Sequence, residues 1–542
     1  TIKIVSTSLL GLSVGCAQCH DHRYDPIPQQ DYYQLRAIFE PALNWKQWRT
    51  PPQRLISLYT EEERKAAADV EAEAQTIANE RAQLQAKFIE EELEKELAKY
   101  KEGLREKLRS AYQTPVDQRT EQQTALLKQN PAVNISAGTL YQYNQASADQ
   151  LTEMDQRIAD VRAKKPVQEF VRVLNEIPGE VPPTHVFYRG EHQQPRQEVS
   201  PAGLTIAAPP GKRHEIPLNN EALPTTGRRL AFARWLFNGT HPLVGRVLVN
   251  RVWMHHFGRG IVGTPGDFGV LGLRPTHPKL LDWMAIEFAE SGWSLKKLHK
   301  QIMLSTVYRQ SSKSDPAKSA IDSANERYWK KPVLRLDAEV IYDRILATGG
   351  AMEHQLYGPP APIAVDDAGQ TIVGADSKRR GIYVQVKRTQ PVALLASFDA
   401  PVMEVNCDCR ASSTASTQSL MLMNSEFILE NARRLAERIR SEAGAWNDKS
   451  EPWDFAPADF DPGDQQTNAL PSWPQQIVYA WQLAFGRSPT SDELAMVRSY
   501  LAEQFEVLRA RRVTDPEIVP SLQDITSLSP ALLSTNACLY VD

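Results

Sequence analysis

Two cysteines and a histidine near the start of the sequence have the types and spacing of a covalent haem attachment site. They are Cys16, Cys19 and His20, in the order Cys-x-x-Cys-His. Each thiol forms a thioether with one haem vinyl group, and two intervening residues let the chain span the macrocycle edge. The histidine that follows lies under the iron. We therefore predict one covalent haem c, with Cys16 and Cys19 as thioether residues and His20 as an axial ligand.

Other uses of the same cysteines remain open at this point. A thioredoxin-type Cys-x-x-Cys requires a βαβ unit, and the flanking sequence has no such pattern. A zinc site requires a second ligand pair, which Cys407 and Cys409 would supply, although Cys-x-Cys is tighter than the usual spacing. A disulfide between Cys16 and Cys19 is the simplest alternative. The sequence assigns no role to Cys407 and Cys409 beyond this.

The second axial position of the iron separates an electron carrier from a catalyst. A histidine or methionine there favours electron transfer, whereas an open face favours chemistry on a small molecule. His255 is the candidate, because it lies on a predicted helix beside Trp253 and Phe257. We predict His255 as a tentative second ligand, and we identify no catalytic residue.

The motif lies in a stretch that resembles the cytochrome-like domain of large secreted planctomycete proteins, named DUF1549 or PSCyt2. Residues 10–27 and 30–35 match that pattern. A second domain of those proteins, DUF1553 or PSD1, is resembled by several later runs, at 228–231, 250–260, 276–283, 308–311 and 398–401. The resemblance implies an exported protein, and haem c is attached outside the cytoplasm. It also implies that the first domain starts upstream of Thr1, so we expect a processed product or a fragment.

Composition describes an ordinary globular protein with several domains. The chain has 542 residues, of which 42% are hydrophobic and 24% charged, and its net charge is −4. That charge gives no argument for nucleic acid, and no apolar run reaches the roughly 20 residues of a transmembrane helix. Five cysteines agree with an exported protein that is not stapled by disulfides. We expect a periplasmic or cell-envelope location.

The elements that must position these residues are mainly α-helical. We predict four segments: 1–57, the C-terminal part of a DUF1549-like cytochrome domain with the motif; 58–165, a long antiparallel helical hairpin or coiled-coil arm; 166–222, a small β-rich connector; and 223–542, a large helical DUF1553-like domain. The heptad-like apolar spacing predicts one helix from Glu61 to Tyr112 and a second up to Pro166. Strands are predicted at 181–190, 204–208 and 380–386, and a single long helix at 417–440.

Three functions follow from these residues. The first is electron transfer through a covalent haem, with a redox partner protein. The second is a haem-dependent oxidoreductase with a substrate pocket in the C-terminal domain, because a carrier needs only about a hundred residues around its haem. The third is a non-catalytic structural or assembly protein of the cell envelope. The 58–165 arm would serve for docking a partner or for self-association.

Overall fold

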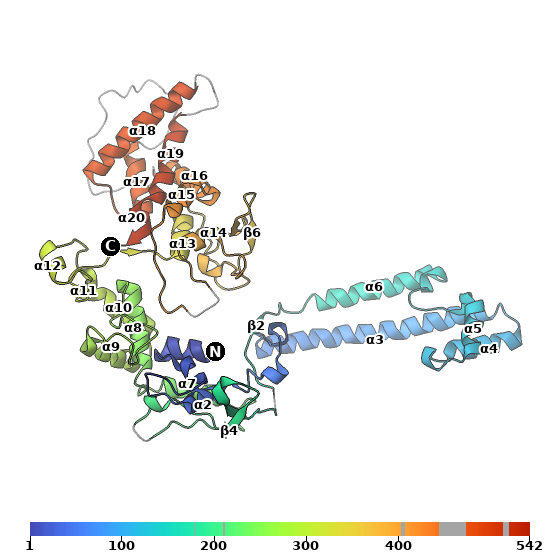
Figure 1. Cartoon of the computed structure of the whole chain (residues 1–542). Coiled ribbons are helices and arrows are strands. Elements are labelled where there is room, and N and C mark those ends of the chain that lie inside the picture. Colours follow the sequence, from blue (N-terminus) through green and yellow to red (C-terminus); the bar gives the residue numbers. More distant parts are fainter. Residues whose placement is uncertain (178, 210–211, 403–406, 444–472, 513–519, 542) are drawn as a thin grey trace. The chain divides into compact units, whose positions relative to one another are not determined.

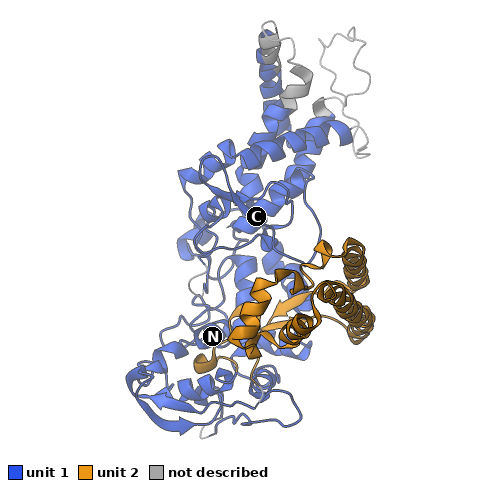
Figure 2. Cartoon of the chain, turned by 90° about the vertical axis from the view of Figure 1, so that its right-hand side faces the viewer, with its two compact units in different colours: residues 1–41, 179–542 blue, residues 42–178 orange. Residues whose placement is uncertain are grey.

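The computed structural model describes residues 1–177, 179–209, 212–402, 407–443, 473–512 and 520–541, and it is mainly helical with a few short strands (Figure 1). Contacts divide the chain into two compact units, residues 42–178 and residues 1–41 with 179–542 (Figure 2). Residues 1–41 of the predicted motif segment therefore share a unit with residues 179–222 of the predicted connector and with the C-terminal domain. The predicted arm forms the other unit, together with the residues on either side of it.

Two long helices pair in the 42–178 unit. They are α3 (Glu61–Leu97) and α6 (Gln145–Arg162). A short antiparallel ladder pairs β1 (Leu55–Ser57), which precedes α3 in the sequence, with β2 (Phe170–Arg172), which follows α6. Glu71 pairs with Arg162 at 2.8 Å, and Arg81 pairs with Asp155 at 2.7 Å. Because the partner number falls as the α3 number rises, the two helices run antiparallel. Thr60 begins α3 with a capping box.

The predicted single helix over 61–112 is wrong, because the chain turns back after α3. Residues 102–113 form a separate helix, α4 (Glu102–Gln113), followed by α5 (Glu121–Gln129). The Arg105 guanidinium donates to the carbonyls of Leu97, Ala98 and Tyr100 and so closes the end of α3. The turn lets apolar side chains of α3, α4 and α5 share one buried cluster. Tertiary burial therefore outweighs the continuous heptad-like pattern.

Replacing Leu108 with alanine tests the packing that this turn creates. Leu108 is fully buried in the shared cluster, whereas Leu104, one turn earlier on α4, is 37% exposed. We expect Leu108→Ala to cost about 2–5 kcal/mol, and Leu104→Ala to change stability by less than about 0.5 kcal/mol. Hydrogen exchange of the arm amides in the whole chain measures both. Equal effects of the two substitutions would contradict the burial of Leu108 in this cluster.

The other unit begins with the motif segment packed on helices from much later in the chain. It contains α1 (Ile2–Val5), a 3-10 helix (Val14–Gln18) and α2 (Gln29–Phe39). These bury apolar side chains against α7 (Arg228–Leu236) and the start of α8 (Val244–Phe257). On α2, Asp31 is completely buried, and it accepts hydrogen bonds from Thr205 and Arg213. The motif therefore rests on a core that combines residues 10–38 with residues 204–244.

A β-hairpin completes this part of the unit. It consists of β3 (Thr184–Phe187), as predicted within 181–190, and β4 (Pro195–Val199). The predicted strand at 204–208 is wrong, since residues Thr205–Ala207 form a 3-10 turn. The turn is fixed because Asp31 binds both the Thr205 amide and the Thr205 hydroxyl, at 2.7 and 2.6 Å.

His241 holds the start of α8 and makes the fold sensitive to acid. Its Nδ1 accepts hydrogen bonds from the amides of Leu243 and Val244, and its ring packs edge-on against Trp235. Burial, with the neighbouring His214, lowers the pKa of His241 to about 4. The folded state therefore favours the neutral His241 ring. Its contribution to stability is present above the ordinary pKa of about 6.5 and is lost as the pH falls from 6.5 through the folded-state pKa of about 4.

We therefore expect His241→Asn to flatten the loss of stability between about pH 6.5 and 4, because asparagine keeps a capping acceptor without binding a proton. Thermal unfolding across that range compares it with the native chain and with His354→Asn, which changes an exposed histidine. An acid sensitivity that both variants retain in full would contradict the role of His241.

The rest of this unit is a series of helices with short two-stranded ladders. The helices are α9 (Pro278–Glu290), α10 (Leu295–Leu304), α11 (Thr306–Arg309), α12 (Pro316–Ile321), α13 (Ala338–Thr348), α14 (Ala393–Ser397), α15 (Ser416–Asn424), α16 (Glu426–Glu442), α17 (Trp473–Phe485), α18 (Ser491–Arg512), α19 (Pro520–Ser534) and α20 (Asn536–Leu539). The ladders pair β5 (Leu334–Arg335) with β8 (Tyr540–Val541), and β6 (Ile363–Val365) with β7 (Thr371–Val373). No described helix has the length and apolarity to span a membrane.

Two further predictions differ from the structure in this region. The predicted strand at 380–386 is a 3-10 turn over Gly381–Tyr383, because Asp343 binds both the Gly381 amide and the Arg380 side chain. The predicted helix over 417–440 is broken at Ser425, which takes an extended conformation between α15 and α16. The break lets Leu422 and Ile428 face the same buried cluster. Tertiary contacts decide the local conformation in both places.

Candidate functional site

The Cys-x-x-Cys-His motif occupies a short 3-10 helix, Val14–Gln18, and the residues after it. Val14 and Ala17 are fully buried in the core below. The side chains of Cys16, Cys19 and His20 are exposed. The three-residue period of a 3-10 helix places Val14 and Ala17 on one face, so the attachment residues are turned to the outside. The structure therefore brings the three predicted attachment residues together on one exposed turn.

Helix α2 holds this turn from below. The Gln18 carbonyl accepts hydrogen bonds from the Tyr33 hydroxyl at 2.9 Å and from Gln29 Nε2 at 3.0 Å. The Gln29 amide donates to the Asp21 carboxylate at 2.7 Å. Burial, with a contribution from Tyr32, raises the pKa of Tyr33 to about 12, so this hydroxyl keeps its proton and donates throughout the neutral range. The motif is thus positioned by polar groups of the helix that follows it.

The two histidines of the motif have different surroundings. His20 Nδ1 donates to the Asp21 carbonyl at 2.6 Å, which is the contact that orients a metal-binding imidazole and leaves Nε2 for the metal. His22 uses both ring nitrogens inside the fold. Its Nδ1 accepts from the Asp25 amide at 2.9 Å, and its Nε2 lies 3.1 Å from the Ser13 hydroxyl. His20 is therefore the histidine that faces outward.

A glycine-rich loop, residues 260–272, packs on the motif segment. The buried Asp25 carboxylate accepts from the Val270 amide at 2.7 Å, and a Cβ at Gly269 would lie 2.5 Å from it. The Phe268 amide donates to the Gly11 carbonyl at 2.6 Å. Val270 and Leu271 of this loop, and Leu273 directly after it, have side chains that are more than half exposed. The loop therefore adds an exposed apolar surface beside the motif segment.

The tip of the β3–β4 hairpin contacts the second cysteine. Gly190 has φ +78°, and a Cβ there would lie 2.8 Å from Cys19 Sγ. The same tip carries Tyr188, with the Arg196 guanidinium 4.4 Å from the centre of its ring. Neither this contact nor the Asp25–Val270 bond was expected from the sequence. The high density of glycine over residues 260–272 was the one feature of the sequence that pointed to the Asp25–Val270 contact.

His255, predicted as a tentative second ligand, lies exposed near the end of α8. Within the described residues, no hydrogen bond, ion pair or ring contact joins it to the motif. Its neighbour His256 bonds His299, with Nε2 and Nδ1 2.8 Å apart. The role of His255 as an iron ligand therefore stays a prediction.

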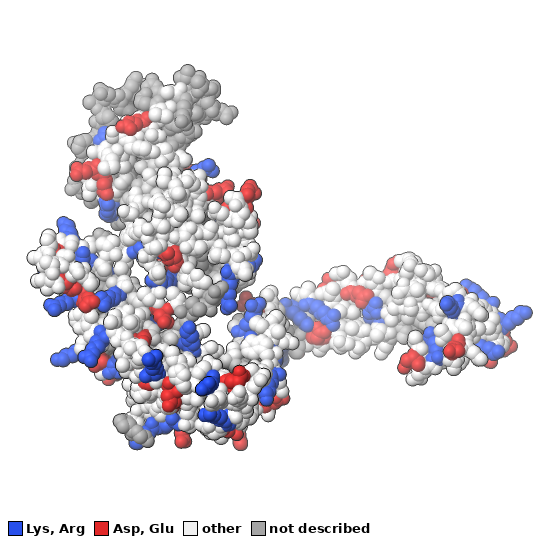
Figure 3. Space-filling view, viewed as in Figure 1, with Lys and Arg blue, Asp and Glu red and all other residues white. Residues whose placement is uncertain are grey.

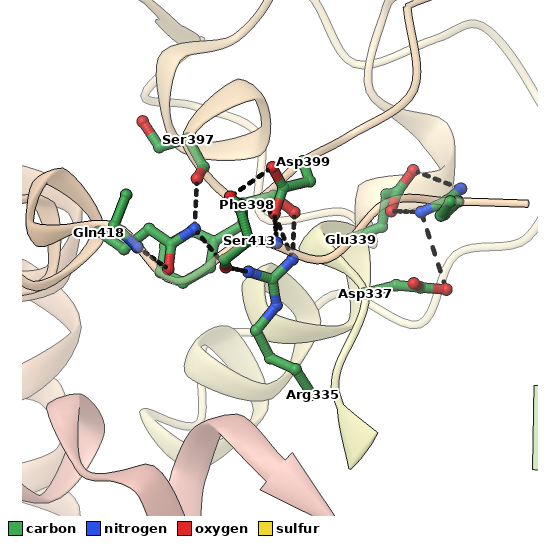
Figure 4. A network of polar contacts seen from close by, with 10 residues as sticks. Arg335, Asp337, Glu339, Ser397, Phe398, Asp399, Ser413 and Gln418 are labelled. Carbon is green, nitrogen blue, oxygen red and sulfur yellow. Dashed lines mark hydrogen bonds and ion pairs between the residues drawn. The ribbon is translucent and has the colours of Figure 1, made fainter. Parts of the chain in front are cut away.

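Cys407 and Cys409 are exposed. Asp399, which precedes them, and Arg410, which follows them, each form an ion pair, and Figure 4 shows the pair of Asp399 with Arg335. Asp399 accepts hydrogen bonds from Arg335 at 2.7 Å and from the Ser413 amide at 2.8 Å, and these donors hold the pKa of Asp399 below its usual range. Past Cys409, the Arg410 guanidinium binds both carboxylate oxygens of Glu339.

The loop of Cys407 and Cys409 meets the glycine-rich loop. The Asp408 carboxylate lies against Gly266, where a Cβ would leave it no room. All five cysteines are free thiols, of which Cys538 is buried. Among the described residues there is no group of three or more histidine, cysteine, aspartate or glutamate side chains placed to hold a metal ion.

A polar cleft of about 470 Å³ lies in the later part of the unit. It is lined by Thr276, His277, Ile321, Asp322, Glu326 and Arg327. Glu326 pairs with Arg259 at 2.6 Å, so the cleft carries groups of both signs. Figure 3 shows the same mixture over the face in view, where Lys and Arg are interspersed with Asp and Glu.

Two family models match the chain. PSD1, described as a protein of unknown function (DUF1553), matches residues 228–501, and PSCyt2, described as a protein of unknown function (DUF1549), matches residues 1–43. The first match covers just over half of the 542 residues. The chain therefore belongs to the DUF1553 family, and it carries a DUF1549 segment at its start. No curated protein and no solved structure matches it.

The residues present fit the haem that the motif implies. The two thiols are free and exposed, and the Nδ1 of His20 is already bonded, so its ring is oriented before any iron binds. Val270, whose amide binds Asp25 five residues beyond His20, forms with Leu271 and Leu273 an exposed apolar stretch of the chain.

Proposed function

We propose that the protein is an exported c-type haem protein that acts in electron transfer, in the periplasm or the cell envelope. One haem c is attached through Cys16 and Cys19, and His20 is an axial ligand. The observation that carries this proposal is the Cys-x-x-Cys-His order on a turn whose three side chains are all exposed. When bound, the haem supplies a one-electron couple between Fe(II) and Fe(III).

The chain's own residues prepare this attachment. The buried Val14 and Ala17 turn the thiols outward, and Tyr33 and Gln29 hold the Gln18 carbonyl so that the turn keeps its shape. The Asp21 carbonyl orients the His20 ring and leaves its other nitrogen for the iron. Exclusion of water by apolar side chains is one way a protein sets a haem potential, and Val270, Leu271 and Leu273 are our candidates for that role.

An absorption spectrum of the protein from a host that makes c-type cytochromes tests the proposal. The oxidised and reduced spectra are recorded first, and then that of the denatured protein with pyridine. We expect haem that stays with the chain after denaturation and has the spectrum of a two-thioether adduct. A colourless chain from that host would overturn the proposal and would favour the structural alternative or a zinc site, which metal analysis would then separate.

The second candidate function is a haem-dependent oxidoreductase, and the polar cleft is the observation that favours it. Such an enzyme keeps an open iron face, so its haem would be five-coordinate and would bind peroxide or cyanide readily. A six-coordinate haem that binds neither favours the carrier. The same native spectra separate the two functions.

An electron carrier requires a redox partner protein, and the 42–178 unit is our candidate for docking or self-association. Its two long helices carry many charged side chains on their exposed faces. Sedimentation velocity over a range of protein concentrations tests self-association. A sedimentation coefficient that does not change with concentration would leave partner docking as the proposed role of this unit.

A further inference from the structure

Two histidines from different helices meet at the surface of the unit that contains the motif. His256 lies near the end of α8 and His299 lies in α10, and their ring nitrogens Nε2 and Nδ1 are 2.8 Å apart. The other nitrogen of each ring makes no hydrogen bond within the part of the chain that the structure describes. When the ring protons sit on those outer nitrogens, the two facing nitrogens both present lone pairs.

The buried core beside the pair fixes the two helices that carry it. Phe257 of α8 and Leu298 of α10 belong to one buried cluster. His256 directly precedes Phe257, and His299 directly follows Leu298. The His256 ring also packs edge-on against Tyr308, at 5.4 Å between centroids. Ligands carried on rigid, packed helices need little further ordering to bind an ion.

The distance between the two facing nitrogens suits one coordination geometry. An imidazole nitrogen binds a divalent transition metal at about 2.0 Å, so two of them at a right angle are about 2.8 Å apart. A tetrahedral zinc ion would need about 3.3 Å between them. The right angle is typical of tetragonal Cu(II) and Ni(II). The same distance suits a hydrogen bond between the rings, with a proton in place of the ion.

The Lys331 ammonium lies close to this pair and limits which ion can bind. Lys331 is buried, donates to the His256 carbonyl at 2.9 Å and lies 3.9 Å from the centre of the Tyr308 ring. Its positive charge opposes a second cation nearby. An ion that binds here must therefore have a high intrinsic affinity for nitrogen ligands. Cu(II) has the highest affinity of the divalent first-row metals.

We infer that His256 and His299 form a Cu(II) site at the surface of this unit. The two histidines bind the ion at a right angle, and water fills the remaining positions because His299 is exposed. The site contains only two protein ligands. It is separate from the haem attachment proposed above and does not depend on it.

Titration of the whole chain with Cu(II), followed by calorimetry and electron paramagnetic resonance, tests the site. Cys407 and Cys409 are replaced with alanine in every sample, because exposed free thiols also bind copper. We expect a tetragonal Cu(II) spectrum with hyperfine splitting from two imidazole nitrogens. His256→Ala and His299→Ala should each weaken binding by at least about tenfold, since even the loss of an outer partner costs about 10–100-fold.

Two exposed histidines provide matched controls. They are His255, the neighbour of His256 on α8, and His354. His255→Ala and His354→Ala should keep the affinity for Cu(II). Ni(II) should bind to the native pair more weakly than Cu(II) does.

Three results would overturn the inference. A native pair that binds no Cu(II) would show that the two rings form a hydrogen bond only. An affinity unchanged in both His256→Ala and His299→Ala would do so too, as would a loss in His255→Ala without one in His299→Ala. Because His299 is exposed, we expect His299→Ala to fold, which circular dichroism checks, and this variant keeps the test decisive if His256→Ala is unstable.

Discussion

Replacing both Cys16 and Cys19 with alanine will yield a protein that releases all of its haem on denaturation. The thioethers are the links that survive unfolding, because axial bonds to iron break when the fold is lost. Each single substitution should leave one thioether and shift the spectrum of the denatured pyridine adduct. Haem staining of denaturing gels and the pyridine spectra measure these effects.

The exposed pair Cys407 and Cys409 provides a matched control for this experiment. Both are free thiols on the surface, as Cys16 and Cys19 are. Cys407→Ala with Cys409→Ala should leave covalent haem unchanged. If haem attachment survived the loss of Cys16 and Cys19, or depended on Cys407 and Cys409, the assignment of the thioether residues would be wrong.

Replacing Asp31 with alanine should cause a large loss of stability. The Asp31 side chain is completely buried, and it accepts from Thr205 and from Arg213, which is 27% exposed. Removing one partner of a buried ion pair leaves an uncompensated charge, at a cost of about 3–5 kcal/mol. We expect a cost of about 3 kcal/mol, at the lower end of this range, because water reaches part of the Arg213 side chain.

Asp155 is the control for Asp31, since it pairs with Arg81 on the surface of the other unit and is 55% exposed. Asp155→Ala should cost less than about 1 kcal/mol. Denaturant unfolding of the whole chain, followed by circular dichroism, compares the two variants. Equal costs would mean that the buried ion pair of α2 contributes no more than an exposed one. Because α2 also carries Tyr33 and Gln29, we expect Asp31→Ala to lower the yield of attached haem as well.

Several elements of the fold could be predicted from local patterns. The helices near 228–237 and 242–257 form as α7 and α8, and Gly258 ends the second with φ +72°. The strand within 181–190 is also present as β3. In each case the apolar period and the turn residues agree with what packing requires. Local pattern and tertiary burial do not compete at these places.

The failures lie where packing outweighs the local pattern. The apolar residues after Leu97 continue a helical stripe, yet the chain turns so that Leu108 returns to the buried cluster beside Leu97. Residues 380–386 alternate as a strand does, yet contacts of Arg380 and Gly381 with Asp343 hold a 3-10 turn. No pattern within these stretches reveals the distant partner that decides their conformation.

The sequence by itself determined the family match, and it alone predicts which residues attach haem. Cys16, Cys19 and His20 are neighbours in the chain, so their pattern can be recognised without knowledge of the fold. The surroundings of that motif were decided only by tertiary structure. Gly190 and Val270 reach the motif segment across long separations in sequence, and a core shared with residues 204–244 buries Val14 and Ala17 beneath the motif.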